Sequence, residues 1–168
     1  ERLSAEDEPY HREPITYEAP YLDNLPTAPR EKFAANIAAI QKLKEIEQRV
    51  ANGGSPAFED EQRILAQYTG WGGLSDAFDP NKSAWSNEYS QLKAALSESE
   101  YEAARSSTLT AFYTPATVIH PIYRALERFG VKGGKILEPS MGTGAFLAHG
   151  HFGSSDAKFY GVELDSIT

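Results

Sequence analysis

The residues best suited to chemistry lie at 138–144, where an acidic residue and a proline precede two closely spaced glycines in the sequence EPSMGTG. Because glycine has no side chain, Gly142 and Gly144 allow the backbone to come close to a ligand. The amino end of a helix beginning after Gly144 can face a negatively charged group. Glu138 can face a positively charged one. The pattern favours a ligand that carries both an ammonium group and a carboxylate.

This loop differs from two common phosphate-binding loops. It lacks the Gly-Lys-Ser/Thr ending of a P-loop. It is also a poor dinucleotide fingerprint, because Leu147 stands where a third glycine should allow close packing of the helix on the strand. A nicotinamide-binding oxidoreductase is therefore disfavoured.

A second acidic residue strengthens the idea of a nucleoside-containing ligand. Glu163 ends a predicted strand, 19 residues after Gly144. An acid at this place can accept hydrogen bonds from both ribose hydroxyls of an adenosyl group. Taken alone, such an acid is more often a solvated surface residue, but the glycine loop and the acid together favour a cofactor such as S-adenosylmethionine.

Composition and charge exclude several other classes. The 168 residues contain no cysteine, which excludes disulfides, thiolate metal sites and a cysteine nucleophile. The formal net charge of −8 argues against strong nucleic-acid binding by this chain alone. No apolar run approaches the roughly 18 residues that span a bilayer, and the first residues do not resemble a secretory signal. We therefore expect a cytoplasmic protein with no membrane partner.

The histidines show no spacing typical of a metal site. The sequence has four of them, at His11, His120, His149 and His151. The last two alternate in a glycine-bounded turn, so we expect them to face solvent.

A strand, a glycine loop, a helix and a second strand are predicted to hold these residues. The predicted strands are 135–138 and 158–163, and a helix starts at 145–149. Within about 30 residues this order is the first βαβ unit of a parallel sheet. A preceding helix is predicted with Thr114 as its cap, Pro115 at its first position and Pro121 as a kink. The apolar face of this helix is predicted to consist of Val118, Ile122, Leu126 and Phe129.

The first hundred residues read as mainly helical after an extended, proline-rich start at 1–29. A long helix is predicted from Arg30, and Gly53-Gly54 should end it. A second helix is predicted from Ser55-Pro56 to about Tyr68.

The later part of this helical region contains a specific loop and two more helices. The loop at 69–74 reads TGWGGL, and its glycines should let backbone approach the Trp71 ring as it plugs a gap between helices. A helix through Trp85 and Leu96 follows. Ser97 has capping-box spacing to Glu100 and should open a helix that ends near Arg105.

Three segments resemble motifs of the amino-methylating, adenine-N6 DNA methyltransferases. Residues 138–144 look like motif I, 160–165 (YGVELD) like motif II and 111–115 (AFYTP) like motif X. Residues 32–40, 68–74 and 105–109 resemble a narrower group, the methylase-helicase fusion proteins of phages, plasmids and integrative conjugative elements. The resemblance covers about residues 30–168.

The resemblance implies roles for the residues that match these motifs. Glu163 would bind the ribose hydroxyls and Leu164 would pack on the adenine face. Gly142 and Gly144 would admit the methionine part. The remaining implied cofactor-binding residues are Glu138 toward the ammonium, Tyr113 and Thr114 toward the carboxylate, and Pro139 and Ser140 of motif I. Tyr113 is equally well explained as a core aromatic, and Thr114 has a competing role as a helix cap.

One part of the family pattern is missing from the sequence. Adenine methylases carry an Asn/Asp-Pro-Pro-aromatic loop that binds the target amine and stacks on the flipped base. The ten prolines here include no adjacent pair. The resemblance therefore implies an amino-terminal fragment that holds the cofactor half of a site and is not expected to catalyse transfer by itself.

The sequence thus predicts an α/β protein with a mainly helical region leading into a truncated, Rossmann-like S-adenosylmethionine-dependent methyltransferase unit. The predicted parts are an extended arm or linker at 1–29, a helical region at 30–106 and the start of the methyltransferase domain at 107–168. Implied partners are DNA, through segments absent from this chain, and a helicase domain of the same polypeptide. The alternative is a non-catalytic, methylase-like interaction or antirestriction module.

Overall fold

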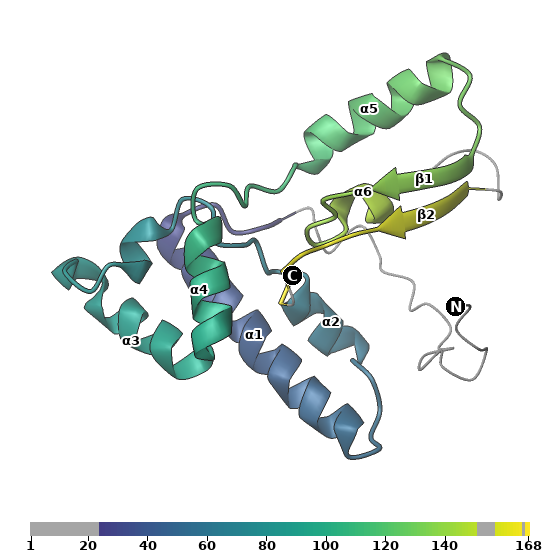
Figure 1. Ribbon diagram of the computed structural model, residues 1–168. Helices are drawn as coiled ribbons and strands as arrows, with labels where there is room; N and C mark the ends of the chain where they lie inside the picture. The colour runs from purple at the N-terminus through teal and green to yellow at the C-terminus, as the bar shows by residue number, and fades with distance from the viewer. Residues whose placement is uncertain (1–23, 151–156, 166) are drawn as a thin grey trace, which may run out of the picture.

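The computed structural model describes residues 24–150, 157–165, 167 and 168. A group of helices precedes a smaller part in which a helix lies beside two parallel strands (Figure 1). This mixed helix and strand content agrees with the predicted α/β class. Most of the predicted extended arm, residues 1–23, lies outside the described residues.

The predicted long helix is confirmed as α1, Pro29–Ala51. Phe33, Ile37 and Ile40 from its apolar stripe are buried in the core of the helical part. The helix ends before Gly53, which adopts a positive φ of 81°. α1 thus packs against both α2 and α3.

The second helix begins later than predicted. α2 spans Glu59–Leu65, and neither Ser55 nor Pro56 starts it. The start is set by Glu61, whose Oε2 accepts a hydrogen bond from the Phe58 backbone N–H at 2.9 Å. Arg49 on α1 holds the same carboxylate through two hydrogen bonds of 2.8 and 2.6 Å. A contact between two helices therefore determines this boundary.

The next two helices follow the prediction closely. α3 spans Ser86–Ala95 and α4 spans Glu98–Ser107, after short 3₁₀ turns at Ser75–Phe78 and Ser83–Trp85. The capping box is confirmed, since Ser97 Oγ accepts from the Glu100 backbone N–H and Glu100 accepts from that of Ser97.

The predicted strand, helix and strand are present, but the second strand ends at Gly161, so Glu163 lies two residues beyond it. β1 spans Gly134–Glu138, α6 spans Ala145–Ala148 and β2 spans Ala157–Gly161. The strands pair in parallel, with Ile136 opposite Phe159 and Glu138 opposite Gly161. Their carboxyl ends therefore meet at one edge, as the placement of the candidate residues requires.

The helix before β1 begins and packs differently from the prediction. α5 spans Ala116–Arg128 and continues through Pro121 (Figure 1). Pro115 is its N-cap residue, so Thr114 does not cap it. Of its apolar residues, Ile119 and Tyr123 are buried, against Ile136, Phe146 and Phe159 among others.

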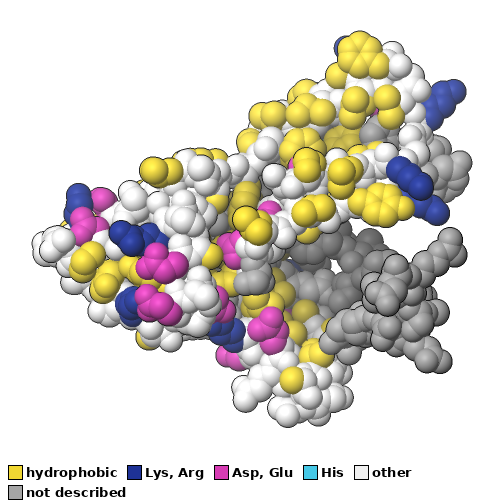
Figure 2. Space-filling model, in the orientation of Figure 1, with side chains coloured by type: hydrophobic (Ala, Val, Ile, Leu, Met, Phe, Trp, Pro, Cys, Tyr) yellow, Lys and Arg dark blue, Asp and Glu magenta, His cyan; other side chains and the backbone are white. Residues whose placement is uncertain are grey.

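Most of the predicted apolar face of α5 is not buried in this structure. Val118, Ile122 and Phe129 are exposed, and only Leu126 packs against the small core. Hydrophobic side chains are visible over this part of the surface in Figure 2. The physical reason is that Tyr123 donates a 2.6 Å hydrogen bond to the Phe146 carbonyl, which fixes the rotation of α5 about its axis.

In the described part of the chain, no helix combines the length and apolar character needed to cross a membrane.

Candidate functional site

The strand ends open into a cavity of about 460 Å³, called here the strand-end cavity. Its other wall is formed by the end of α4 and by the segment that runs from α4 to Tyr113. Cavities of this size are typical of small-ligand sites. Five of the nine predicted cofactor-binding residues line it, namely Tyr113, Ser140, Gly142, Glu163 and Leu164.

Glu163 is held in a defined position by backbone donors. Its Oε2 accepts from the Gly142 N–H at 2.8 Å, and its Oε1 accepts from the N–H groups of Leu164 and Asp165 at 2.8 and 3.0 Å. Partial burial acts to raise the pKa of this carboxyl, but the three donors outweigh it and lower the pKa below its ordinary value. Glu163 is therefore ionised at neutral pH, and a carboxylate has capacity to accept further hydrogen bonds.

Two exposed apolar side chains line the same cavity as this carboxylate. Leu164 is 99% exposed, and Phe112 is 65% exposed. Large apolar side chains left in water around a polar anchor are a common feature of binding sites. The arrangement can accept a flat, weakly polar ring next to a group that offers hydroxyl donors.

Tyr113 stands between the helical part and the glycine loop. A Cβ placed on Gly70 or on Gly142 would lie 3.0 or 2.9 Å from its ring, so both glycines are needed for this fit. Its hydroxyl is 3.1 Å from Thr168 Oγ1, and burial raises its pKa. Tyr113 packs against the helical core and also lines the cavity, so both alternatives for its role agree with its position.

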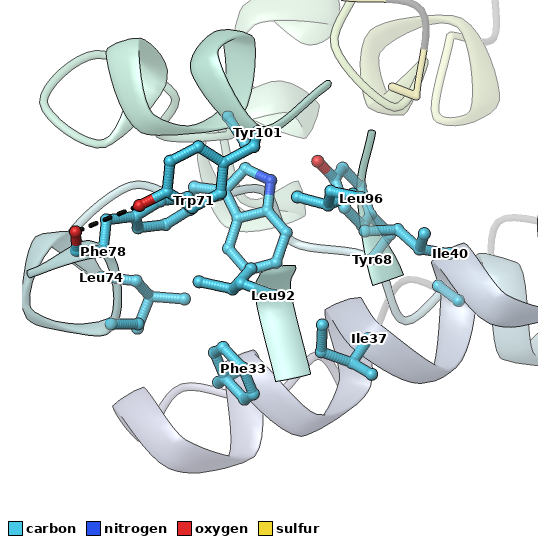
Figure 3. Close-up of a cluster of buried hydrophobic side chains, with 13 residues drawn as sticks. Phe33, Ile37, Ile40, Tyr68, Trp71, Leu74, Phe78, Leu92, Leu96 and Tyr101 are labelled. Carbon is cyan, nitrogen blue, oxygen red and sulfur yellow. Dashed lines mark hydrogen bonds between the residues drawn. The ribbon is translucent and has the colours of Figure 1, made fainter. Parts of the chain in front are cut away.

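The loop at 69–74 holds the Tyr113 segment in place. Trp71 is fully buried at the centre of the helical core, as predicted, with an edge-on contact to Phe78 (Figure 3). Gly70 and Gly72 also make room for the segment that contains Tyr113. Gly70 is in contact with Tyr113, and the closest neighbour of Gly72 is the Ala111 carbonyl oxygen.

Asn36 fixes this loop and was not singled out from the sequence. Its side-chain amide donates to the Gly70 carbonyl at 2.7 Å and accepts from the Thr69 backbone N–H at 2.8 Å. The sequence did contain a sign of this role, since Asn36 is a polar residue beside the apolar stripe of α1. A buried side-chain amide needs hydrogen-bond partners, and backbone groups of a nearby loop can supply them.

A buried hydroxyl also borders the strand-end cavity. Tyr68 lines this cavity, and its hydroxyl has no hydrogen bond of good geometry among the described residues. The same holds for the Trp71 indole nitrogen. Figure 3 shows these two polar atoms on the same side of the core. Burial raises the pKa of Tyr68, so this residue presents a neutral hydroxyl.

Thr114 lines a different cavity, of about 490 Å³, which we call the Lys32 cavity. Tyr113 and Phe112 line both cavities, whereas Thr143 lines the Lys32 cavity beside Thr114. Lys32 on α1 reaches the Gly72 carbonyl through a 2.9 Å hydrogen bond. Burial lowers the pKa of its ammonium group.

Three predicted residues lie away from both cavities. Glu138 lines a third cavity beside Tyr123, on the α5 side of the sheet. Its Oε1 accepts a 3.3 Å hydrogen bond from the Ser140 N–H. Gly144, with a φ of 78°, is the N-cap of α6. Neither it nor the exposed Pro139 lines any of these three cavities.

The histidine prediction is partly wrong. His149 is 6% exposed, and its Nδ1 lies 3.2 Å from Nε2 of His120. The contact between α5 and the end of α6 buries it. His11 and His151 lie outside the described residues. Among the residues that the structure describes, no group of three or more potential ligands could hold a metal ion.

Comparison of the chain with known protein families, with curated proteins and with solved structures found no match.

Proposed function

We propose that the strand-end cavity binds the adenosyl group of S-adenosylmethionine, and that the chain carries the cofactor-binding half of an adenine-N6 DNA methyltransferase-like protein with a Rossmann-like fold. The observation that carries the proposal is the position of Glu163. Its ionised carboxylate is fixed by Gly142, Leu164 and Asp165 at the carboxyl edge of a parallel pair of strands. A ribose diol can donate to such a carboxylate in two directions.

The surrounding side chains match the rest of an adenosyl group. Leu164 and Phe112 offer apolar surface to the adenine ring. The negative charge of Glu163 and Asp165, which line the same cavity, favours a ligand whose sulfonium is positively charged. Tyr68, which lines the same cavity, presents a neutral hydroxyl as a further polar group.

The proposal assigns cofactor binding to these residues, and not methyl transfer. Transfer moves a methyl group from the sulfonium to an exocyclic amine, which loses a proton, and the sulfur becomes a neutral thioether. The Asn/Asp-Pro-Pro-aromatic loop that holds this amine in the family is not present in the 168 residues. Contacts with DNA and with a helicase domain belong to the same proposal and would be made by other segments.

One observation favours the alternative of a non-catalytic interaction module. The carboxylate of Glu163 is already satisfied by three backbone donors, and the ring of Tyr113 fills the space beside Gly142. In such a module this arrangement would be purely structural. The two candidate functions differ in whether the chain binds S-adenosylmethionine, so a binding experiment distinguishes them.

Heteronuclear NMR titration of the ¹⁵N-labelled chain tests the proposal, because it detects weak binding and identifies the affected amides. S-adenosylmethionine should cause saturable shifts at Gly142, Leu164 and Asp165. NAD carries the same adenosyl group next to a negatively charged pyrophosphate, which Glu163 and Asp165 repel, so it should cause smaller shifts at the same concentrations. Absence of shifts with S-adenosylmethionine would favour the interaction module, and shifts with NAD alone would favour a nicotinamide site.

A further inference from the structure

The Lys32 cavity combines a cation with several hydroxyl groups. Its walls include the Lys32 ammonium from α1, Thr69 from the loop that follows α2, and Thr114, Thr117 and Thr143 from the second part of the chain. No Asp or Glu from the described residues lines it. The strand-end cavity, in contrast, is lined by Glu163 and Asp165. The two cavities therefore differ in the sign of the charge they favour.

Lys32 has donor capacity to spare for a ligand. An ammonium group has three N–H donors, and the structure assigns one of them, to the Gly72 carbonyl at 2.9 Å. Burial lowers the pKa of this ammonium, which means that its charge is incompletely compensated. An anion in the cavity would compensate this charge and offset the free-energy cost of burying it.

The beginning of α5 also favours an anion in the Lys32 cavity. The first turn of this 13-residue helix borders the cavity through Ala116 and Thr117. Its N-cap residue, Pro115, supplies no side-chain acceptor. The amino end of a helix attracts negative charge, so it acts together with Lys32.

The two cavities are neighbours along the glycine loop. Gly142 lines the strand-end cavity, the next residue, Thr143, lines the Lys32 cavity, and Phe112 and Tyr113 line both. A ligand with an adenosyl group at Glu163 and a carboxylate at its far end would meet opposite charges in the two places.

We propose that Lys32 binds the carboxylate of the methionine portion of S-adenosylmethionine, so that the helical part contributes directly to the cofactor site. This inference rests on the proposed function and adds a binding residue that lies outside the three methyltransferase-like motifs. It also explains why a lysine on α1 lies against the segment that contains Thr114.

Two ligands that differ only in the carboxylate test the assignment. NMR titration of the full chain should give a weaker affinity for decarboxylated S-adenosylmethionine than for S-adenosylmethionine itself. Lys32→Gln should reduce the affinity for S-adenosylmethionine by about 10-fold, as expected for loss of a charge-assisted hydrogen bond. Its affinity for the decarboxylated ligand should stay within about 2-fold of the wild-type value, because that ligand has no group for Lys32 to bind.

Two further variants serve as controls. Lys32→Arg keeps the charge and should retain most of the preference for the carboxylate. Lys42→Gln removes a lysine from the same helix that lines neither cavity and should change neither affinity. Equal losses for both ligands in Lys32→Gln, or no loss for either, would overturn the role of Lys32 while leaving the proposed function intact. Failure of the wild-type chain to bind either ligand would overturn both.

Discussion

At the scale of single residues, Glu163 combines a structural and a proposed chemical role. Its carboxylate links the glycine loop to the segment after β2 through hydrogen bonds to Gly142, Leu164 and Asp165. These donors keep it ionised and fix its orientation. A group oriented in this way loses little entropy when a ligand binds, which is the usual basis of a preorganised site.

The first prediction separates these two roles of Glu163. In the wild-type chain, adenosine should bind more tightly than 2′,3′-dideoxyadenosine, which lacks both ribose hydroxyls. Glu163→Ala should remove this difference and weaken binding of S-adenosylmethionine by about 1.5–3 kcal/mol, or about 10- to 150-fold. Ligand titration of the four combinations forms a double-mutant cycle. If Glu163→Ala still discriminates between the two nucleosides, the carboxylate does not bind the ribose.

The positions of Glu163 and Glu138 show what the sequence could predict at this scale. Parallel strands bring their carboxyl ends to one edge, so the approach of Gly142 to Glu163 followed from the predicted elements. Glu138 is two residues after Ile136 and lies on the same face of β1, toward α5. The alternation of side chains along a strand would have argued against placing it in the strand-end cavity.

At the scale of elements, the loop at 69–74 joins the helical core to the candidate site. Trp71 anchors it in the core, and Asn36 holds its backbone. Because Gly70 and Gly72 have no side chains, the Tyr113 ring can lie against Gly70 and the Ala111 carbonyl against Gly72. The buried tryptophan was predicted from its glycine-rich surroundings. The contacts of these glycines with Tyr113 and Ala111 were not predicted, because those residues are about 40 positions away in the sequence.

The second prediction concerns the stability that Trp71 provides. Trp71→Ala removes a fully buried indole and should lower the free energy of unfolding by about 3–5 kcal/mol. Trp85→Ala is the matched control, since Trp85 is only partly buried at the edge of the same core, and should cost about 1–2 kcal/mol. Urea unfolding measures both. Unchanged stability in Trp71→Ala with loss of ligand binding would show that the ring acts in the site.

The third prediction concerns the pairing of α1 with α2 through Arg49 and Glu61. Hydrogen bonds from the Arg49 guanidinium and from the Phe58 N–H lower the pKa of Glu61 to about 2 from 4.5. Because the folded-state pKa is depressed, this contribution to stability is complete above about pH 4.5 and is lost as the pH falls toward 2. Glu61→Gln should therefore be less stable than wild type at pH 7, and the difference should shrink at pH 3.

Urea unfolding at the two pH values checks this behaviour. Glu59→Gln is the control on the same helix, because Glu59 pairs with Arg63 at an exposed surface and should change stability little at either pH. A difference between Glu61→Gln and wild type that is equal at pH 7 and pH 3 would contradict the role of the ionised carboxylate.

At the scale of the whole molecule, the described part of the chain has two separate hydrophobic cores. One lies among α1, α3, α4 and the loop at 69–74, and the other lies between α5, α6 and the two strands. Tyr113 and Ile167, from the second part of the chain, pack against the first core. The cavities at this junction are therefore shaped by both parts. Sequence patterns predict each helix or strand separately, so they could not predict how the two parts of the chain come together around these cavities.

The fourth prediction concerns catalysis by these 168 residues. No incorporation of tritium-labelled methyl groups into unmodified DNA should be detected, because no Asn/Asp-Pro-Pro-aromatic sequence is present to hold the target amine. An active adenine methylase serves as the positive control in the same assay. Transfer above background would mean that residues assigned here to the scaffold are catalytic.

The central claim, that an adenosyl group lies in the strand-end cavity, is tested most directly by intermolecular NOEs. With S-adenosylmethionine bound to the ¹³C,¹⁵N-labelled chain, the adenine and ribose protons should show NOEs to the Leu164 methyl groups and to the Phe112 ring, which are the exposed apolar groups of that cavity. NOEs from the adenine to Ile122 or Leu147 of the third cavity instead, with none to Leu164, would contradict the claim.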